Sequence, residues 1–402
     1  MRYSVSYFRR TRFFLGEIIP LLILLGIMSC KKDDEKDPES PPPVNAEIIE
    51  GNIDSPRVLG PVNAYGNSTY RFIGRTDVNA TLTIEPGVVV LFDKEADLYI
   101  KQNGALKAIG SETAKIIFKG GQDTKGYWGG LYFDSGSEEN NLRYCVIENA
   151  GDRDRSIPAR TSAVVVHNGG RLVMRDTRVS KSGGYGIFLY EKASLPDFNN
   201  NTILESSTAP AIASLENISY FNNSNNFQGN THDHVDTYNS YNYLRGDHIW
   251  RKLNVPYRLP GKRVDIEGAI TVEAGASFIG TPSCAIRVQP GASFSAEGSS
   301  DAPIVFRGQE ARRGFWGGFQ FVSGSEKNVF RHVTLEHAGG SNTFAIPERR
   351  AGIEVASTGR LVIADSKISH SDGPAIRAHK NAWLSEIGNS YTDNERNEVA
   401  TY

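Results

Sequence analysis

The sequence predicts an all-β fold, a parallel β-helix made from two tandem copies of one unit, with a targeting segment and a tether ahead of it. Three observations support this prediction. A long internal repeat divides the chain into two similar parts. The pattern of short apolar runs repeats roughly every 20–25 residues within each part, and no stretch shows a sustained helical periodicity.

Residues 1–29 predict a lipoprotein signal peptide. Residues 1–14 carry four arginines and no acid, and residues 15–28 are mostly apolar. Glu17 and Pro20 interrupt this run, which is too short and too broken for a stable membrane span of about 20 residues. The run ends in Ile-Met-Ser-Cys30, which resembles a lipobox. Cys30 is therefore expected to be acylated and to become the mature N-terminus.

Residues 30–46 predict a lipidated tether. Two lysines followed by Asp33, Asp34 and Glu35 resemble the surface-export signal of Bacteroidota lipoproteins, and a merely soluble charged spacer is the alternative. A mixed coil of this length, with its prolines, reaches roughly 20–25 Å. Each buried methylene of an acyl chain contributes ~0.8 kcal/mol to membrane binding. We therefore expect a protein of the outer membrane, lipid-anchored and exposed on the cell surface.

The internal repeat covers most of the remaining chain. GYWGGLYF at 126–133 returns as GFWGGFQF at 314–321, and the numbering offset between the two tryptophans is 188 (316 − 128). NLRYCVIENAG and VFRHVTLEHAG keep that offset, and RLVMRD returns as RLVIAD at an offset of 189 (360 − 171). Many motifs keep their order and spacing, so we predict two copies, residues 47–231 and 232–402.

Each copy contains short strand-like runs separated by Gly, Asn or Asp. In the first copy the predicted strands are 82–84, 88–92, 98–100, 116–118, 131–133, 163–166, 172–174 and 187–189. Such a repeat suits coils of about three strands, each strand pairing with its equivalent one rung (~4.8 Å) away. Ile187 and Ile376 are expected to point inward. A β-sandwich, which also uses short strands, is the alternative architecture.

The same residues carry a family resemblance. LTIEPGVVVLF, GALKAIGS, IIFKG, WGGLYF and LRYCVIENAG look like the right-handed parallel β-helix repeats of bacterial surface lipoproteins, which are related to the pectin-lyase fold. The resemblance implies a right-handed helix over nearly all of the mature chain. It implies no particular activity, because one fold hosts many functions.

Charge and cysteine content limit the remaining possibilities. Without residues 1–29 the chain has 40 basic residues (44 − 4) and 45 acidic residues (46 − 1), which does not favour a nucleic-acid partner. Cys145 and Cys284 lie far apart along the chain and occupy different positions in the repeat. We interpret both as small buried hydrophobic residues rather than as a disulfide bridge.

The Gly-aromatic-Trp segments are the first candidate binding site. Tyr127 and Trp128 in one copy, and Phe315 and Trp316 in the other, could stack on sugar rings. The alternative is that each Trp packs across the end of a coil, as a duplicated structural residue would.

Two insertions, residues 152–160 and 340–350, interrupt a coil at the same place in both copies. Loops that project from a rigid scaffold commonly carry binding residues. Arg160, Arg349 and Arg350 could bind carboxylate or sulfate groups of a glycan, or acidic groups of a protein. Solvated arginines on a turn are an equally good interpretation. The hypothesis is that both loops and the aromatic segments form one ligand surface.

The sequence offers little for metal binding or catalysis. The His/Asp cluster lies in the Asn-rich connector and lacks known metal-ligand spacing, so no metal or cofactor is expected: His232, Asp233, His234, Asp236, Asp247 and His248. Asp176, Arg178 and Lys181 come nearest to a polysaccharide-lyase arrangement, and Asp365 and Lys367 copy part of it.

We therefore expect a non-catalytic surface lipoprotein that binds, or provides a scaffold for, a glycan or a neighbouring outer-membrane protein. The alternative is a polysaccharide lyase or hydrolase. Convergence of acidic and basic side chains in one groove of a single copy would favour the enzyme.

Overall fold

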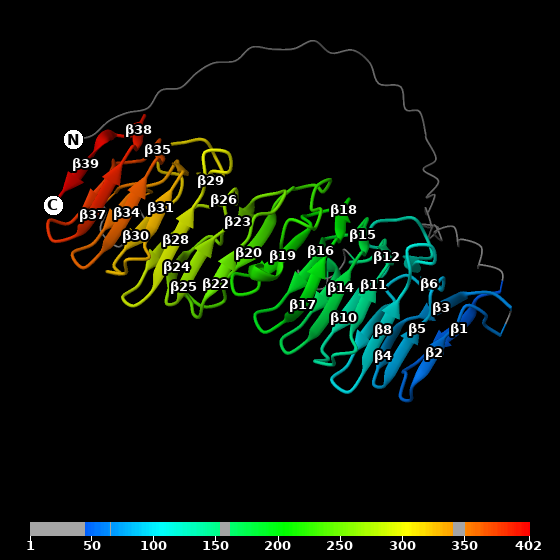
Figure 1. Cartoon of the computed structure of the whole chain (residues 1–402). Coiled ribbons are helices and arrows are strands. Elements are labelled where there is room, and N and C mark those ends of the chain that lie inside the picture. The colour runs from blue at the N-terminus through cyan, green and yellow to red at the C-terminus, as the bar shows by residue number, and fades with distance from the viewer. Residues whose placement is uncertain (1–44, 65, 153–160, 341–349) are drawn as a thin grey trace, which may run out of the picture. The chain divides into compact units, whose positions relative to one another are not determined.

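The computed structural model describes residues 45–402 apart from residues 65, 153–160 and 341–349 (Figure 1). The predicted signal peptide, Cys30 and the tether up to residue 44 lie outside this part. Pro43–Tyr402 form one compact unit. Among the described residues, no helix has the length and apolar character that a membrane crossing requires.

The strands of the first half, residues 47–231, contribute to three sheets. Sheet A contains β1 (Glu47–Glu50), β3 (Thr69–Ile73), β6 (Val89–Phe92), β9 (Ile116–Gly120), β12 (Cys145–Glu148), β15 (Arg178–Ser180) and β18 (Thr202–Leu204). Sheet C contains β2 (Arg57–Leu59), β5 (Thr81–Ile84), β8 (Ala105–Ile109), β11 (Asn141–Arg143), β14 (Arg171–Arg175) and β17 (Ser194–Asn199).

Sheet B runs through both halves of the chain. It contains β4 (Arg75–Val78), β7 (Asp97–Ile100), β10 (Gly130–Phe133), β13 (Ser162–Val166), β16 (Tyr185–Leu189), β19 (Ala211–Ser214), β20 (Val235–Tyr238), β23 (Tyr257–Arg258), β26 (Ser277–Gly280), β29 (Ile304–Gly308), β32 (Val333–Glu336), β35 (Lys367–Ser369) and β38 (Ser390–Thr392).

Two further sheets belong to the second half, residues 232–402. Sheet D contains β21 (Tyr243–Leu244), β24 (Arg263–Ile266), β27 (Ala285–Val288), β30 (Phe319–Phe321), β33 (Ile353–Val355), β36 (Pro374–Ala378) and β39 (Arg396–Thr401). Sheet E contains β22 (His248–Trp250), β25 (Ala269–Val272), β28 (Ser293–Glu297), β31 (Val329–Arg331), β34 (Arg360–Ala364) and β37 (Trp383–Ile387).

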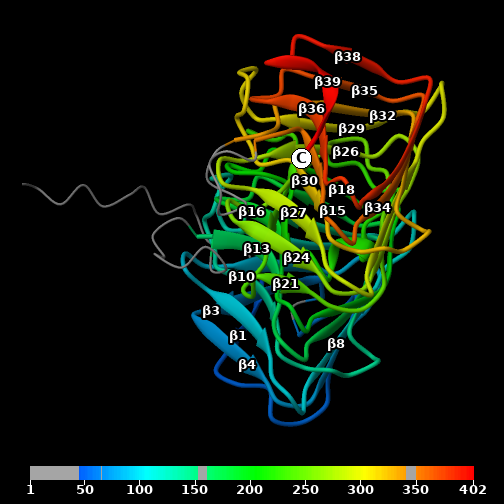
Figure 2. The same ribbon diagram turned by 90° about the vertical axis from the view of Figure 1, so that its left-hand side faces the viewer.

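The pairing of these strands decides the architecture. Within each half a strand pairs with the strand three places earlier in the chain, as β6 does with β3 and β27 with β24, except that β3 pairs with β1. Every ladder between described strands is parallel. Figure 2 shows the strands of successive coils stacked in layers. The all-β prediction is confirmed, the arrangement is consistent with a parallel β-helix, and the sandwich alternative is wrong.

The apolar side chains of successive coils form one continuous core. It extends from Ile49 to Ala378, and the predicted inward residues Ile187 and Ile376 are both fully buried. All eight strands predicted in the first copy are present, with small differences in their bounds. Cys145 and Cys284 are buried free thiols, as predicted. Burial raises the pKa of the Cys284 thiol to about 12, so this group stays protonated.

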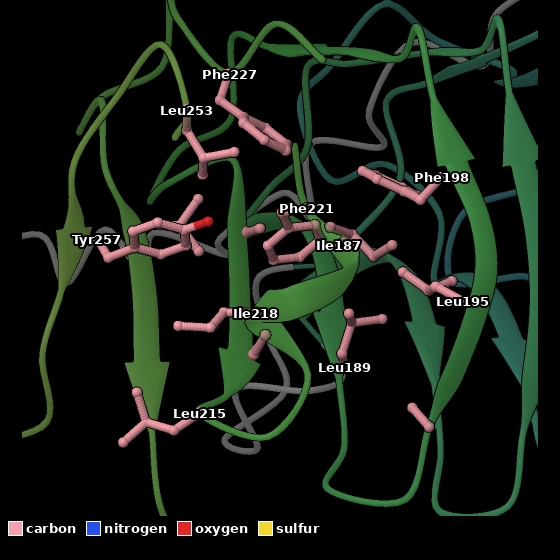
Figure 3. Close-up of a cluster of buried hydrophobic side chains, with 14 of the residues drawn as sticks. Ile187, Leu189, Leu195, Phe198, Leu215, Ile218, Phe221, Phe227, Leu253 and Tyr257 are labelled. Carbon is pink, nitrogen blue, oxygen red and sulfur yellow. The ribbon is translucent and has the colours of Figure 1, made fainter. Parts of the chain in front are cut away.

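The Asn-rich connector between the halves is ordered by buried amides. Asn225 Oδ1 accepts hydrogen bonds from the Asn201 backbone (3.0 Å) and side-chain amide (3.1 Å), one coil away. A 3₁₀ turn, η2 (Ile218–Tyr220), replaces a strand here. Figure 3 shows Ile218 and Phe221 among the buried side chains at this point. The connector therefore belongs to the stack of coils.

Segments related by the internal repeat occupy different sheets. Strands β6, β9 and β12 lie in sheet A, whereas their equivalents in the repeat, β26, β29 and β32, continue sheet B. Strands β7 and β10 lie in sheet B, and their equivalents β27 and β30 lie in sheet D. The second half is thus shifted by one sheet relative to the first.

Candidate functional site

The two tryptophans of the Gly-aromatic-Trp segments lie in the core. Trp128 is 0% exposed and Trp316 is 1% exposed. Each indole Nε1 donates to the same relative carbonyl, Glu148 O at 2.8 Å and Glu336 O at 2.9 Å. The Trp128 ring also stacks on Phe92, with centroids 3.9 Å apart. Packing across a coil accounts for these residues, and neither ring presents a face to a ligand.

The flanking aromatics agree with that interpretation. Phe315 is buried, and Tyr127 is partly buried against the core. Burial raises the pKa of the Tyr127 hydroxyl. The sequence hypothesis of an aromatic sugar platform at these segments therefore does not match the observed burial.

The arginines of the inserted loops are only partly described. Arg160 and Arg349 lie outside the described residues, and Arg350 Nη1 pairs with Asp372 Oδ2 at 2.6 Å. The first insertion connects sheet A to sheet B, and the second connects sheet B to sheet D. The two loops therefore start from different sheet boundaries, which does not favour one shared ligand surface.

Part of the His/Asp cluster forms a buried ion-pair network. Asp236 is 4% exposed and accepts hydrogen bonds from Arg258 Nε at 2.5 Å and the Tyr185 hydroxyl at 2.8 Å. His234 Nε2 lies 3.1 Å from the same carboxylate. Burial alone would raise the pKa of Asp236, but the hydrogen bonds and charges of His234 and Arg258 lower it to about 2. No group of three or more metal-ligand side chains occurs in the described residues.

A groove of about 470 Å³ follows the corner between sheets C and A. Acidic, basic and aromatic side chains of the first half line it: Glu112, Lys115, Tyr144, Asp176, Thr177, Arg178, Asn200 and Thr202. We call it the acid–base groove. Acidic and basic side chains thus converge in one groove of a single copy, which is the arrangement expected of an enzyme. Of these residues, only Asp176 and Arg178 were identified from the sequence.

Tight corners hold the side chains of the acid–base groove. Tyr144, Asp176 and Asn200 each stand between a strand of sheet C and one of sheet A, with φ values of 49°, 49° and 57°. A left-handed residue turns the chain within one or two positions, so these side chains stack one above another. Asn200 Nδ2 donates to Asp176 Oδ1 at 3.2 Å, and Arg143 Nε lies 3.7 Å from Asp176 Oδ2. The Asp176 carboxylate is thereby held in place.

The second half keeps only part of this set of residues. At the equivalent positions it has Ser300, Pro303 and His332 in place of Glu112, Lys115 and Tyr144, whereas Asp365 and Lys367 keep the acid of Asp176 and the base of Arg178. His332 and Asp365 keep the left-handed backbone, with φ values of 46° and 51°. The fold therefore requires the corner conformation and does not require Glu112, Lys115 or Tyr144.

A second groove, of about 420 Å³, lies where η2 interrupts the strands. We call it the connector groove, and its lining is mostly polar: Leu195, Pro196, Phe198, Asn199, Ser219, Tyr220, Asn222, Asn223, Arg251 and Glu273. Asn222 Nδ2 donates to Asn199 Oδ1 at 2.9 Å, and Arg251 Nε donates to Ser219 O at 3.3 Å. Asn199 and Asn200 are adjacent in the chain, so the two grooves flank one corner.

Sequence reasoning missed Glu112 and Lys115 because nothing in their local context marks them. They approach Asp176 and Arg178 only through the stacking of coils that are distant in the sequence. Comparison with protein-family models, with curated proteins and with solved structures finds no match to this chain.

Proposed function

We propose that this protein is a cell-surface lipoprotein that binds a polysaccharide in the acid–base groove. The observation that supports this most directly is that Glu112, Lys115 and Tyr144 line the groove in one half, whereas Ser300, Pro303 and His332 take their places in the other. Duplication retains what the fold needs, so residues found in one half alone, here Glu112, Lys115 and Tyr144, indicate a role outside folding.

The attachment and the repeat are part of the same proposal. Residues 1–29 act as a signal peptide, Cys30 carries the lipid anchor, and residues 30–46 act as a tether to the outer membrane. Residues 47–231 and 232–402 are two tandem copies in a right-handed helix. The matching indole hydrogen bonds of Trp128 and Trp316 support the duplication.

The groove suits an extended ligand with hydroxyl and acidic groups. From β9 to β18 it crosses three steps of sheet A, about 14 Å at ~4.8 Å per step. Lys115 and Arg178 supply donors for carboxylates or sulfates, and Glu112 supplies an acceptor for hydroxyls. The Tyr144 ring is partly exposed and adds an apolar face for a sugar ring.

Binding can be tested with Arg178→Ala and Lys115→Ala in the full chain. Polygalacturonate, chondroitin sulfate and neutral dextran serve as probes in affinity electrophoresis. We expect retardation by at least one of the two anionic polymers, and roughly a tenfold loss of affinity in each variant. Lys367→Ala changes the equivalent of Arg178 in the second half and should bind like the wild type. Wild-type affinity in both Arg178→Ala and Lys115→Ala would refute a role for the groove.

A polysaccharide lyase is the second candidate, because two carboxylates and two basic side chains share this groove. In such a reaction Lys115 or Arg178 would remove the proton α to a uronate carboxylate. The C–O bond at the β position then breaks, a C=C bond forms in the uronate ring, and the departing sugar leaves with the glycosidic oxygen, which takes up a proton from the basic group or from water.

This activity is measurable as ultraviolet absorbance of unsaturated ends when the protein is incubated with polygalacturonate. A catalytic groove should lose roughly 100-fold or more in rate with Lys115→Ala or Arg178→Ala. Binding without any unsaturated product would exclude a lyase and leave the binding function in place.

A further inference from the structure

An aromatic stack stands at the first strand of sheet D, away from the acid–base groove. Tyr241 lies in a bend just before β21 (Tyr243–Leu244), and Arg245 directly follows this strand. The contacts between the three side chains show that they lie together on one side. The tyrosine rings are nearly parallel, 14° apart, with centroids separated by 5.4 Å. Arg245 Cζ lies 4.1 Å from the Tyr243 centroid. Together they form the column Arg245–Tyr243–Tyr241.

Hydrogen bonds hold this column on both sides. Tyr243 pairs with Asp265 in the ladder between β21 and β24, and Arg245 Nε binds Glu267 Oε2 at 2.9 Å. Asn239 Oδ1 accepts from the Tyr241 N–H at 3.2 Å, and Asn239 Nδ2 donates to Tyr243 O at 3.1 Å. The rings are thus positioned before any ligand arrives, which reduces the entropy cost of binding.

The outer ring of the column is exposed and has hydrogen-bonding groups nearby. Tyr241 is 52% exposed, one of few large hydrophobic side chains in the described residues to be so open. The preceding residue, Ser240, donates from its hydroxyl to the Glu191 carboxylate. A ring face next to a hydroxyl and a carboxylate matches a pyranose, which presents C–H groups on its faces and hydroxyls at its edge.

The local charges favour an uncharged sugar. Arg245 is paired with Glu267 at 2.9 Å, and Arg263 is paired with Asp265 at 2.9 Å. Both arginines near the stack are therefore already neutralised, and Glu191 adds a negative charge next to Ser240. An anionic glycan would meet more acid than base here.

The fold does not require the stack. In the second half Leu244 pairs with Ile266. The repeat counterpart of Ile266 is Val78, which forms a parallel bridge with Ile53 in the first half. Ile53 therefore occupies the place of Leu244. Asn52 and Asp54 then stand where the second half has Tyr243 and Arg245. A coil at this position forms equally well without the aromatic column.

We infer that Tyr241 is a stacking subsite for a neutral pyranose residue, separate from the acid–base groove. The inference rests on the proposed glycan-binding function and adds to it a second site with a different ligand class. One exposed ring fits one sugar residue, whereas a protein interface of about 800 Å² per partner requires a broader apolar patch.

The test is isothermal titration of the full chain in detergent with cellohexaose, mannohexaose and xylohexaose. We expect at least one of them to bind, and Tyr241→Ala to weaken binding about tenfold. Tyr241→Phe keeps the ring and should stay within about threefold of the wild type. Ile249→Ala removes another exposed side chain, 43% exposed on β22, and serves as the control.

Other outcomes would overturn the inference. The subsite does not exist if none of the three oligosaccharides binds, or if Tyr241→Ala binds like the wild type. Loss of anionic-polymer binding in Arg178→Ala alongside unchanged neutral-sugar binding in Tyr241→Ala would refute this inference alone. Absence of every interaction would refute the proposed function as well. Capture of a protein partner that depends on Tyr241, without any sugar binding, would assign the stack to a protein interface instead.

Discussion

At the scale of single residues, burial separates structural from candidate binding groups. Trp128 and Trp316 look like a binding motif in the sequence, yet their indole N–H groups bond to backbone carbonyls inside the core. Asp236 belongs to a His/Asp cluster in the sequence, and in the structure Arg258 and Tyr185 form hydrogen bonds to its carboxylate. Tyr241 attracts no notice in the sequence, yet half of its surface is exposed. Residue type alone does not distinguish these cases, because accessibility depends on the neighbouring coils.

The Asp236 network predicts acid sensitivity. The pKa of Asp236 is about 2 in the folded protein and 3.8 as the reference value, so the unfolded chain binds its proton more tightly. This group therefore stabilises the fold above about pH 4 and loses that contribution as the pH falls toward 2. Asp236→Asn should cost about 3 kcal/mol at pH 7, because Arg258 is left unpaired.

Urea unfolding monitored by circular dichroism measures the stability that Asp236→Asn loses. This loss in the free energy of unfolding should be much smaller near pH 2.5 than at pH 7. Glu138→Gln changes a carboxylate that is 90% exposed and should alter stability by less than about 0.5 kcal/mol. A cost for Asp236→Asn that is the same at both pH values would contradict this electrostatic account.

At the scale of elements, stacking places equivalent residues of successive coils together. Tyr144, Asp176 and Asn200 share a left-handed backbone because each turns a sheet C strand into a sheet A strand over a very short connection. Three different residue types adopt this strained conformation, so the sequence does not reveal the column. Inward positions are different, because period-two alternation of apolar residues marks them directly.

The stacked core predicts a large cost for truncating an inward side chain. Ile187→Ala and Ile376→Ala should each destabilise the fold by ~2–5 kcal/mol, because fixed neighbours above and below cannot fill the cavity. Chemical unfolding gives the measurement, and Ile249→Ala at an exposed site should stay within ~0.5 kcal/mol. A cost below about 1 kcal/mol at both inward sites would show that the coils relax around the gap.

At the scale of the whole molecule, the shift by one sheet separates equivalent surfaces. Counterparts of sheet A strands continue sheet B, so matched outer positions of the two halves belong to different sheets. The acid–base groove of the first half and the Tyr241 column of the second half consequently need not serve the same part of a ligand. On our proposal, the two halves of the chain carry two distinct sites on one scaffold.

Attachment through Cys30 is the prediction at this scale. Cys30→Ala should release the protein from the membrane fraction or leave an unprocessed precursor, since the acyl chains supply the membrane affinity. Fractionation with immunoblotting measures this. Replacing Asp33, Asp34 and Glu35 with Ala should keep the lipid but reduce protease accessibility on intact cells. Normal processing and full membrane retention in Cys30→Ala would refute the anchor.

Patterns along the chain were enough to predict the all-β class, the strands of the first copy, the inward isoleucines and the buried free cysteines. These properties follow from local alternation and from an internal repeat, both of which are visible in the sequence. Only the folded chain shows which sheet each repeated segment joins, because the connector around η2 determines how the coils of the second half align with the sheets of the first half. Only the folded chain likewise shows that Glu112 and Lys115 line one groove with Arg178, and that Tyr241 is exposed. Contacts between coils join residues far apart in the chain, and no local pattern records them.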